Sequence, residues 1–287
     1  MASDGPQNVA RCRPLSRPHR QPRVVLVTGT SSGLGRAIAS ALHARGDRVF
    51  GSSRGPAAPA AFPQLTLDVR DEASVQAAVE AVVKEAGRLD AVVNNAGWGL
   101  AGAIEDTTVA EAQAQLDTNF FGVHRVCRAV LPRFRAQGHG HIIIVGSMAG
   151  LVSMPFQAFY CASKFALEGY AEALRMEVKP FGVQVCLVEP GDYATGFTQG
   201  RQRSLASGSP SPYAASLERA LAVMVRDEQS NSDLSPVGRV VLRALDAPRP
   251  PLRFPSATLA QRLLLVIKPF VPDAVVEWVV EKMYQLR

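Results

Sequence analysis

A tyrosine, a lysine and a serine have residue types and spacings suited to acid–base chemistry. Tyr160 and Lys164 are four residues apart in "YCASK", and Ser147 follows the apolar run "HIIIVG". In a helix, residues i and i+4 share one face with Cβ atoms about 5–6 Å apart, so the phenol and the amine would be neighbours. A free phenol has a pKa of about 10, and a nearby ammonium lowers it toward neutrality. Such a pair can also be incidental helix surface, and the spacing alone does not decide. If it is functional, the pattern predicts proton transfer to or from a substrate oxygen that Ser147 hydrogen-bonds.

Short apolar runs alternate with helical segments from residue 23 onward, and this pattern would position those three residues. The strand-like runs are "VVLVTG", "RVFGSSR", "LTLDV", "LDAVVNNAG", "HIIIVGS" and "VQVCLVEPG", with "PPLRF" as a last candidate. Between them lie segments of helical periodicity, including a long one over about 109–135 and another that contains Tyr160 and Lys164. Alternating elements with fully apolar strands predict a single α/β domain: a doubly wound parallel sheet of about seven strands with helices on both faces.

A glycine-rich loop joins the first predicted strand to the first predicted helix. In "VVLVTGTSSGLGRAIA" the glycines are Gly29, Gly33 and Gly35. Glycines there permit a tight turn, let the backbone approach a pyrophosphate and leave amides free at a helix N-terminus. A glycine-rich turn without a ligand is the alternative interpretation, but the strand before and the helix after it favour a dinucleotide site.

The end of the second predicted strand indicates which dinucleotide is preferred. In this fold that position faces the adenosine ribose, where an acidic residue would select NAD. This chain has Ser52, Ser53 and Arg54 there instead. Because a guanidinium binds a phosphate in a bidentate manner, we predict NADP over NAD, with Ser31 and Arg54 at the 2′-phosphate.

Five motifs in order make the chain resemble the short-chain dehydrogenase/reductases over residues 23–255. They are "TGTSSGLG" (28–35), "LDV" (67–69), "NNAG" (94–97), the Ser147, Tyr160 and Lys164 set, and "EPGDYAT" (189–195). The resemblance implies a Rossmann-type domain that binds a nicotinamide cofactor. It implies cofactor contacts from Gly29, Ser31, Ser32, Gly33, Leu34, Gly35, Arg54, Asp68, Val69, Asn95, Ala96, Gly97, Tyr160, Lys164, Pro190, Gly191 and Thr195, with Asp68 near the adenine amino group.

The same resemblance implies roles for four catalytic residues. NADPH would deliver a hydride to a carbonyl carbon, Tyr160 would protonate the oxygen, and Ser147 would polarise it. Lys164 would bind the nicotinamide ribose and lower the pKa of the phenol. Asn119, in "LDTNFFG", matches the helix asparagine that holds a water in the proton relay. In the reverse direction the same groups would oxidise a secondary alcohol.

The predicted substrate pocket is largely apolar and aromatic. Its candidate residues are Trp98, Met148, Met154, Phe156, Gln157, Tyr193 and Phe197, together with Leu100, Leu151 and Val152, and about half of them are expected to be core instead. Such a wall suits a hydrophobic ketone, aldehyde or alcohol better than a sugar. The stretches "VFGSSR" and "NNAGWG" and the apolar C-terminus resemble the hydroxysteroid and retinol dehydrogenase branch, which implies a steroid, a retinoid or an aromatic carbonyl.

Composition divides the chain into three parts. Residues 1–22 are predicted to be a disordered basic arm; residues 1–23 hold five arginines against one aspartate, so most of the net charge of +6 lies there. Residues 23–255 form the catalytic domain, with a substrate lid at about 192–235. Residues 256–287 form a helical extension whose apolar face is core or subunit contact, or a peripheral membrane face. The arm lacks aromatic residues that would stack on bases, so a solvated tail is favoured over a nucleic-acid contact.

The cysteine spacing and the length of the apolar runs bear on whether the chain binds a metal or spans a membrane. The four cysteines lack metal-ligand spacing, so no metal is predicted, and three of them are expected in the core, in keeping with a cytoplasmic location. No apolar run is long enough to span a membrane. The alternative to an enzyme is a silent NADP-sensing regulator of the same fold, which would usually lack the tyrosine or the lysine. Family resemblance implies a homodimer or homotetramer built on helices near 109–135 and 158–180.

Overall fold

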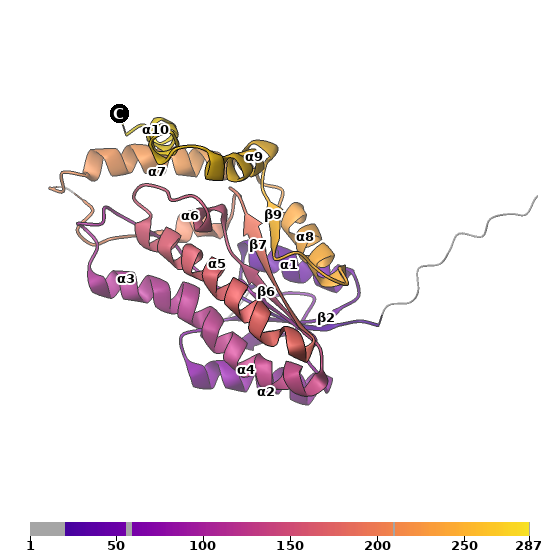
Figure 1. Cartoon of the computed structure of the whole chain (residues 1–287). Helices are drawn as coiled ribbons and strands as arrows, with labels where there is room; N and C mark the ends of the chain where they lie inside the picture. The colour runs from indigo at the N-terminus through magenta and orange to yellow at the C-terminus, as the bar shows by residue number, and fades with distance from the viewer. Residues whose placement is uncertain (1–20, 56–58, 209, 287) are drawn as a thin grey trace, which may run out of the picture.

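A central parallel sheet organises the chain. The structure, a computed structural model, describes residues 21–55, 59–208 and 210–286. Seven strands lie in the order β3-β2-β1-β4-β6-β7-β9, all parallel to their neighbours (Figure 1). Their bounds are β1 Val24–Thr28, β2 Arg48–Ser53, β3 Gln64–Thr66, β4 Ala91–Asn94, β6 Gly140–Val145, β7 Val183–Pro190 and β9 Arg253–Ser256. The predicted fold class and strand number are confirmed.

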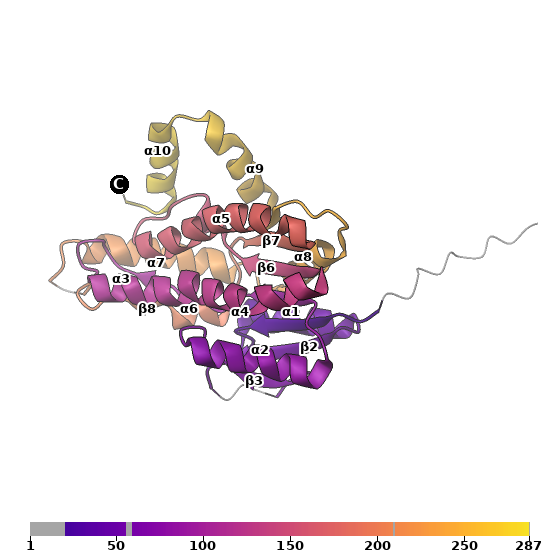
Figure 2. The same ribbon diagram turned by 60° about the horizontal axis from the view of Figure 1, so that its bottom comes forward.

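Helices cover both faces of the sheet. One face packs against α2 (Glu72–Ala86), α4 (Gly122–Gln137) and α5 (Ala158–Val178), and the other against α1 (Gly33–Ala44) and α8 (Ser235–Asp246) (Figures 1 and 2). Alternate residues of one strand serve the two cores: Val24 and Leu26 pack with the first group, Val25 and Val27 with the second. Because both faces are buried, the strand sequences are apolar at nearly every position.

The long helix expected over 109–135 contains a local irregularity. The structure has α3 (Val109–Leu116), a π-helical turn (Asp117–Phe121) and then α4. A capping box starts α3, in which the Thr108 hydroxyl accepts from the Glu111 amide and the Glu111 carboxylate accepts from the Thr108 amide. The π-helical turn lies where Asn119 is buried, and such turns are frequent at functional sites.

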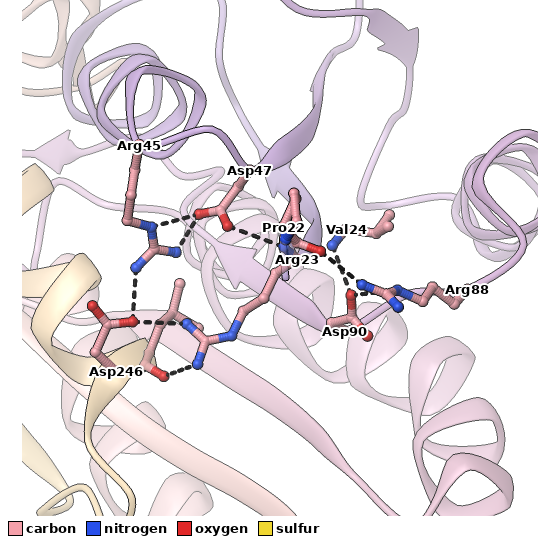
Figure 3. Close-up of polar contacts among 9 residues, drawn as sticks. Pro22, Arg23, Val24, Arg45, Asp47, Arg88, Asp90 and Asp246 are labelled. Atoms are coloured by element: carbon pink, nitrogen blue, oxygen red, sulfur yellow. Dashed lines mark hydrogen bonds and ion pairs between the residues drawn. The ribbon is translucent and has the colours of Figure 1, made fainter. Parts of the chain in front are cut away.

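A cluster of arginines and aspartates anchors the start of the sheet. The amide of Arg23 donates to Asp47 at 3.1 Å, and its guanidinium donates to Asp246 at the end of α8 at 3.0 Å. Asp90 accepts from the Val24 amide at 2.7 Å and pairs with Arg88 at 3.0 Å (Figure 3). These contacts fix the amino ends of β1 and β4. The predicted basic arm lies almost entirely in residues 1–20, which are outside the described residues.

The segment after β7 folds above the carboxyl ends of the strands. It contains α6 (Gly196–Gly200), β8 (Gln202–Arg203) and α7 (Ala214–Gln229), and β8 pairs with β5 (Leu100–Ala101). Neither two-residue strand was predicted, because so short a run shows no periodicity. After β9, α9 (Leu259–Ile267) and α10 (Asp273–Met283) project from the body as a helical pair (Figure 2). Among the described residues, no helix combines the length and apolarity needed to cross a bilayer.

Candidate active site

A single continuous cavity of about 410 Å³ joins the glycine loop to the tyrosine and lysine. It lies at the carboxyl ends of the central strands, where open α/β sheets bind ligands. All four predicted catalytic residues line it. So do these predicted cofactor contacts: Gly29, Ser31, Ser32, Gly33, Leu34, Gly35, Arg54, Val69, Asn95, Ala96, Gly97, Pro190, Gly191 and Thr195. Of the predicted substrate pocket, the cavity wall includes Trp98, Met154, Gln157, Tyr193 and Phe197.

The glycine loop is tied to the end of β4. The side-chain amide of Asn95 donates to the carbonyls of Thr28 and Gly29, each at 3.0 Å. In return, the Thr28 hydroxyl accepts from the amides of Asn95 and Ala96, each at 3.0 Å. The loop conformation is therefore set before a ligand arrives, which reduces the ordering cost of binding.

The shape of this loop fits a dinucleotide pyrophosphate. Gly29 has a φ of +72°, which glycine adopts readily, and a Cβ at Gly35 would lie 2.2 Å from the Gly29 carbonyl oxygen. Gly33 and Gly35 lie in the first turn of helix α1, which lines the cavity, and the N-cap residue Ser32 makes no side-chain cap hydrogen bond to the amides of that turn. A cradle free of side chains at a helix N-terminus is suited to phosphate oxygens.

The three residues that suggested acid–base chemistry meet in the same cavity. Ser147 follows β6, and its hydroxyl accepts from the Ala149 amide at 3.1 Å, which begins a tight helical turn, Met148–Gly150. Tyr160 and Lys164 lie one turn apart in α5, with the ammonium 5.7 Å from the phenol ring centroid. The Lys164 Nζ donates to the Val145 carbonyl at 2.9 Å. The expected i, i+4 neighbour relation is thus present.

The pKa of Tyr160 departs from the expected direction. Burial raises it above its ordinary value, and a hydrogen bond with Ser147 opposes that rise only in part. Lys164 lies beside the ring, but its own burial disfavours the ammonium form, so it does less to stabilise a phenolate. The chain's own residues therefore keep the phenol protonated, a state ready to donate a proton.

Burial also lowers the pKa of Lys164 from 10.5 to about 8, against the opposing influence of Glu168. Between these two pH values the unfolded chain holds the proton and the folded chain does not. The free energy of unfolding therefore rises with pH in that window, and the burial penalty is full below it.

Lys164→Met should be more stable than the wild type at neutral pH, by an amount that shrinks as pH rises from about 8 to 10.5. Urea unfolding of both proteins across this range would measure it, and a pH-independent difference would contradict it.

Asn119 connects the π-helical turn to the catalytic helix. Its amide donates to the Trp98 carbonyl at 3.0 Å and to the Ser163 hydroxyl at 3.3 Å, and its oxygen accepts from the Trp98 amide at 3.1 Å. Ser163 in turn donates to the Tyr160 carbonyl at 2.6 Å. These contacts hold α5 in place relative to the cavity. The water-relay role of Asn119 stays a prediction.

Three predicted site residues are not among those that line the cavity. Asp68 is paired with Arg70 at 2.6 Å, which lowers its pKa to about 2, and it is not part of the cavity wall. Met148 belongs to the turn that packs on α5, and Phe156 packs with the buried face of α7 at a φ of +61°. The further candidates Leu100, Leu151 and Val152 are also outside the wall. Spacing alone could not distinguish cavity wall from core.

Other lining residues were not predicted. The cavity wall also contains Asp192, Asp227, Glu228, Met224, Met283 and Tyr284, and closer to the sheet Ser53, Leu67, Thr118, Val145, Gly146, Gly196 and Gly200. Tyr284, the residue directly after α10, packs against the cluster that includes Leu217 and Met224 of α7. No local sequence signal marks Met224, Asp227, Glu228, Met283 and Tyr284, since they reach the cavity through the packing of α7 and of the end of α10 and the residues after it.

A Rossmann-type sheet with a glycine cradle and a Ser–Tyr–Lys set in one cavity defines a nicotinamide-dependent oxidoreductase. The family model for short chain dehydrogenase matches residues 23–206, and the chain belongs to that family. It is 40% identical over 268 residues to a 3-ketodihydrosphingosine reductase of Bacteroides thetaiotaomicron, covering 93% of this chain and 100% of that protein.

Two further similarities agree with this. Human 17-beta-hydroxysteroid dehydrogenase type 1 is 35% identical over 257 residues, covering 80% of this chain and 76% of that one. A short-chain dehydrogenase from Streptomyces avermitilis superposes with a TM-score of 0.75 at 31% identity, covering 91% of this chain and 96% of that one. The chain is thus an oxidoreductase acting on CH–OH groups or the corresponding carbonyls, with a nicotinamide cofactor.

Proposed function

We propose that this chain uses NADPH to reduce a ketone carried on a long aliphatic chain. The observation that supports this most directly is the continuous cavity that places Ser147, Tyr160 and Lys164 beside an apolar compartment. Met154, Phe197, Met224 and Met283 contribute to that compartment, and unbranched methionines pack readily against flexible alkyl chains. The 3-ketodihydrosphingosine reductase, matched over its full length, acts on a ketone of this kind by its name.

The chain's own residues would bind, orient and protonate. The glycine loop, Asn95 and Thr195 would hold the cofactor, which when bound would supply the hydride. Ser147 would hydrogen-bond the carbonyl oxygen, and Tyr160, kept protonated by burial, would donate its proton to that oxygen. Lys164, fixed by the Val145 carbonyl, would present its amine toward the cofactor ribose. A silent NADP-sensing regulator would not need the complete set.

The choice of NADP depends on Arg54, which is exposed and lines the cavity at the end of β2. A charge-assisted hydrogen bond to the 2′-phosphate is worth about 1.5–3 kcal/mol. Arg54→Ala should therefore raise KM for NADPH by about 10- to 100-fold and leave KM for NADH within about twofold. Steady-state kinetics with both cofactors would measure this. Arg48→Ala, at the opposite end of β2, is the control, and a retained NADPH preference in Arg54→Ala would contradict the assignment.

The substrate proposal is tested by following NADPH oxidation with purified protein. 3-Ketodihydrosphingosine in detergent micelles, a steroid ketone and retinal would be compared at equal concentration. We expect the long-chain ketone to be turned over most efficiently. The steroid is the second candidate, favoured by the similarity to the human hydroxysteroid dehydrogenase. Higher kcat/KM for the steroid or retinal would overturn the first choice.

The proposal extends to assembly and location. Helices α3, α4 and α5 with their flanking turns carry exposed apolar residues, among them Val109, Phe121, Phe165 and Met176. Their exposure supports a homodimer or homotetramer built on these helices, which light scattering would test. The lid role of residues 192–235 and a cytoplasmic location are retained as parts of the same proposal.

A further inference from the structure

Charge is distributed unevenly along the cavity wall. The described cationic residues that line it are Arg54, at the end of β2, and Lys164. Three carboxylates line the part formed by the segment after β7: Asp192, Asp227 and Glu228. Glu228 acts electrostatically on Tyr160, and all three carboxylates act on Tyr284, so the three acidic groups lie in one region of the cavity, and Glu228 connects that region to the catalytic tyrosine. The cofactor is an anion, but the substrate end of the cavity is negatively charged.

Two of these carboxylates are neutralised by the chain itself. Glu228 pairs with Arg201 and also accepts from the Thr198 hydroxyl. Asp227 pairs with Arg226 at the surface at 3.0 Å. Each therefore has a positive partner.

Asp192 differs from the other two. One of its oxygens accepts from the neutral amide of Gln261 at 2.6 Å, and no described cation lies within ion-pair distance of it. Burial, together with Glu228 and Asp227, raises its pKa above the ordinary value, while the Gln261 hydrogen bond and the charge of Arg201, which is paired with Glu228, act in the opposite direction. A partly buried carboxylate without an ion-pair partner of its own is costly, and a cationic ligand would offset that cost.

A second unsatisfied acceptor borders the same cavity. Gln157 lies three residues before Tyr160 and is only 2% exposed. Its Oε1 has no hydrogen-bond donor among the described residues, although the residue forms part of the cavity wall. A buried amide oxygen left without a donor is costly. This oxygen is closed to water, so a rotation of the side-chain amide toward the cavity would let a ligand that brings a donor satisfy it.

The remaining wall is apolar, with Met154, Phe197 and Met224 as examples. A suitable substrate therefore combines a cation and hydrogen-bond donors near the reacting carbonyl with a long apolar body. An ammonium on the carbon next to the ketone has these properties, since it supplies three donors and one positive charge.

We propose that Asp192, assisted by Gln157, binds an ammonium adjacent to the reacting carbonyl and so selects amino ketones over neutral ketones. This inference rests on the proposed reduction of a long-chain ketone. Asp192 acts here as a specificity residue, because it contacts the part of the substrate that does not react. One carboxylate oxygen accepts from Gln261, which leaves the other for the ammonium.

The test compares 3-ketodihydrosphingosine with its analogue that has hydrogen in place of the amine. The readout is the ratio of kcat/KM for the two ketones. Wild type should favour the amine, and Asp192→Asn should lower that ratio by about 10- to 100-fold, mainly through KM, as expected for a lost charge-assisted bond. Asp192→Glu, which keeps the charge, should retain most of the preference. Glu80→Gln, a surface carboxylate of α2, should leave the ratio unchanged.

The other outcomes separate the possible failures. An unchanged ratio in Asp192→Asn would overturn the inference and leave the reductase proposal intact. A raised KM for NADPH with both ketones would place Asp192 at the cofactor and also overturn it. Should wild type reduce neither ketone, the proposed function has failed. In that case calorimetry would test the inference separately. It would measure the affinity of wild type and of Asp192→Asn for a long-chain amine and for the matching alcohol. An equal loss of affinity for both ligands in Asp192→Asn would refute the inference.

Discussion

Tyr160→Phe is expected to lower kcat by about 10²- to 10⁴-fold, the range for removal of a general acid. The phenol lies in the cavity with Ser147 and Lys164, and burial keeps its proton in place. Phenylalanine preserves the ring, its packing against Phe197 at 5.3 Å between centroids and the rest of α5. NADPH affinity, measured by cofactor fluorescence, should therefore change by no more than about twofold.

Tyr170→Phe provides the matched control. Tyr170 lies in the same helix, and its hydroxyl contacts His124 at 3.2 Å outside the cavity wall. Its loss should leave kcat nearly unchanged. Near-wild-type turnover in Tyr160→Phe, or an equal loss in both variants, would remove Tyr160 from the role of proton donor.

Gly35→Ala is the second change with a large expected effect. The new Cβ would lie 2.2 Å from the Gly29 carbonyl oxygen and 2.3 Å from the Asn95 side-chain nitrogen. Neither contact is tolerable, so the loop must move away from Asn95 and Thr28. Overpacking of this kind costs about 1–3 kcal/mol of stability. Displacing the loop by about 1 Å should lower NADPH affinity and kcat/KM by about 100-fold.

Gly169→Ala controls for the substitution itself. Gly169 is also a helical glycine, but an added Cβ meets nothing within 4 Å. Alanine there should stabilise the protein by about 0.5–1 kcal/mol and leave cofactor binding unchanged. Thermal melts and NADPH titrations of both variants would separate the effects. Normal NADPH affinity in Gly35→Ala would show that the loop does not depend on this close approach.

Acidic residues on the cavity wall bear on which class of substrate the cavity suits. The predicted pocket residues are mostly apolar, and they favoured steroids, retinoids and aromatic carbonyls. Of the three carboxylates on the wall, Asp227 and Glu228 are paired with arginines, and Asp192 accepts from the neutral amide of Gln261. Under the proposal made above, an amphiphile with a positive group near its ketone would match both Asp192 and the apolar wall.

Local sequence determined most of the fold and the chemistry. Apolar runs such as "HIIIVG" alternate with helical segments, and strands buried on both faces can satisfy that pattern only inside a covered parallel sheet. The glycine loop and the Tyr160–Lys164 spacing were also readable, because a turn and a helix are set by residues a few positions apart. Ser147 was found by its place directly after a strand.

Two features depended on tertiary structure alone. They are the residues that cover the substrate end of the cavity and the pKa values of the ionisable groups in it. Tyr284 and Met283 reach the cavity because the residues that follow α10 pack onto α7, a contact between segments with no shared sequence pattern. Asp68 is paired with Arg70 between two cavity-lining residues, Leu67 and Val69, and its contact with the adenine stays a prediction. The pKa of Tyr160 is raised rather than lowered, because desolvation depends on everything packed around the ring. Burial is a property of the assembled fold, and no spacing along the chain encodes it.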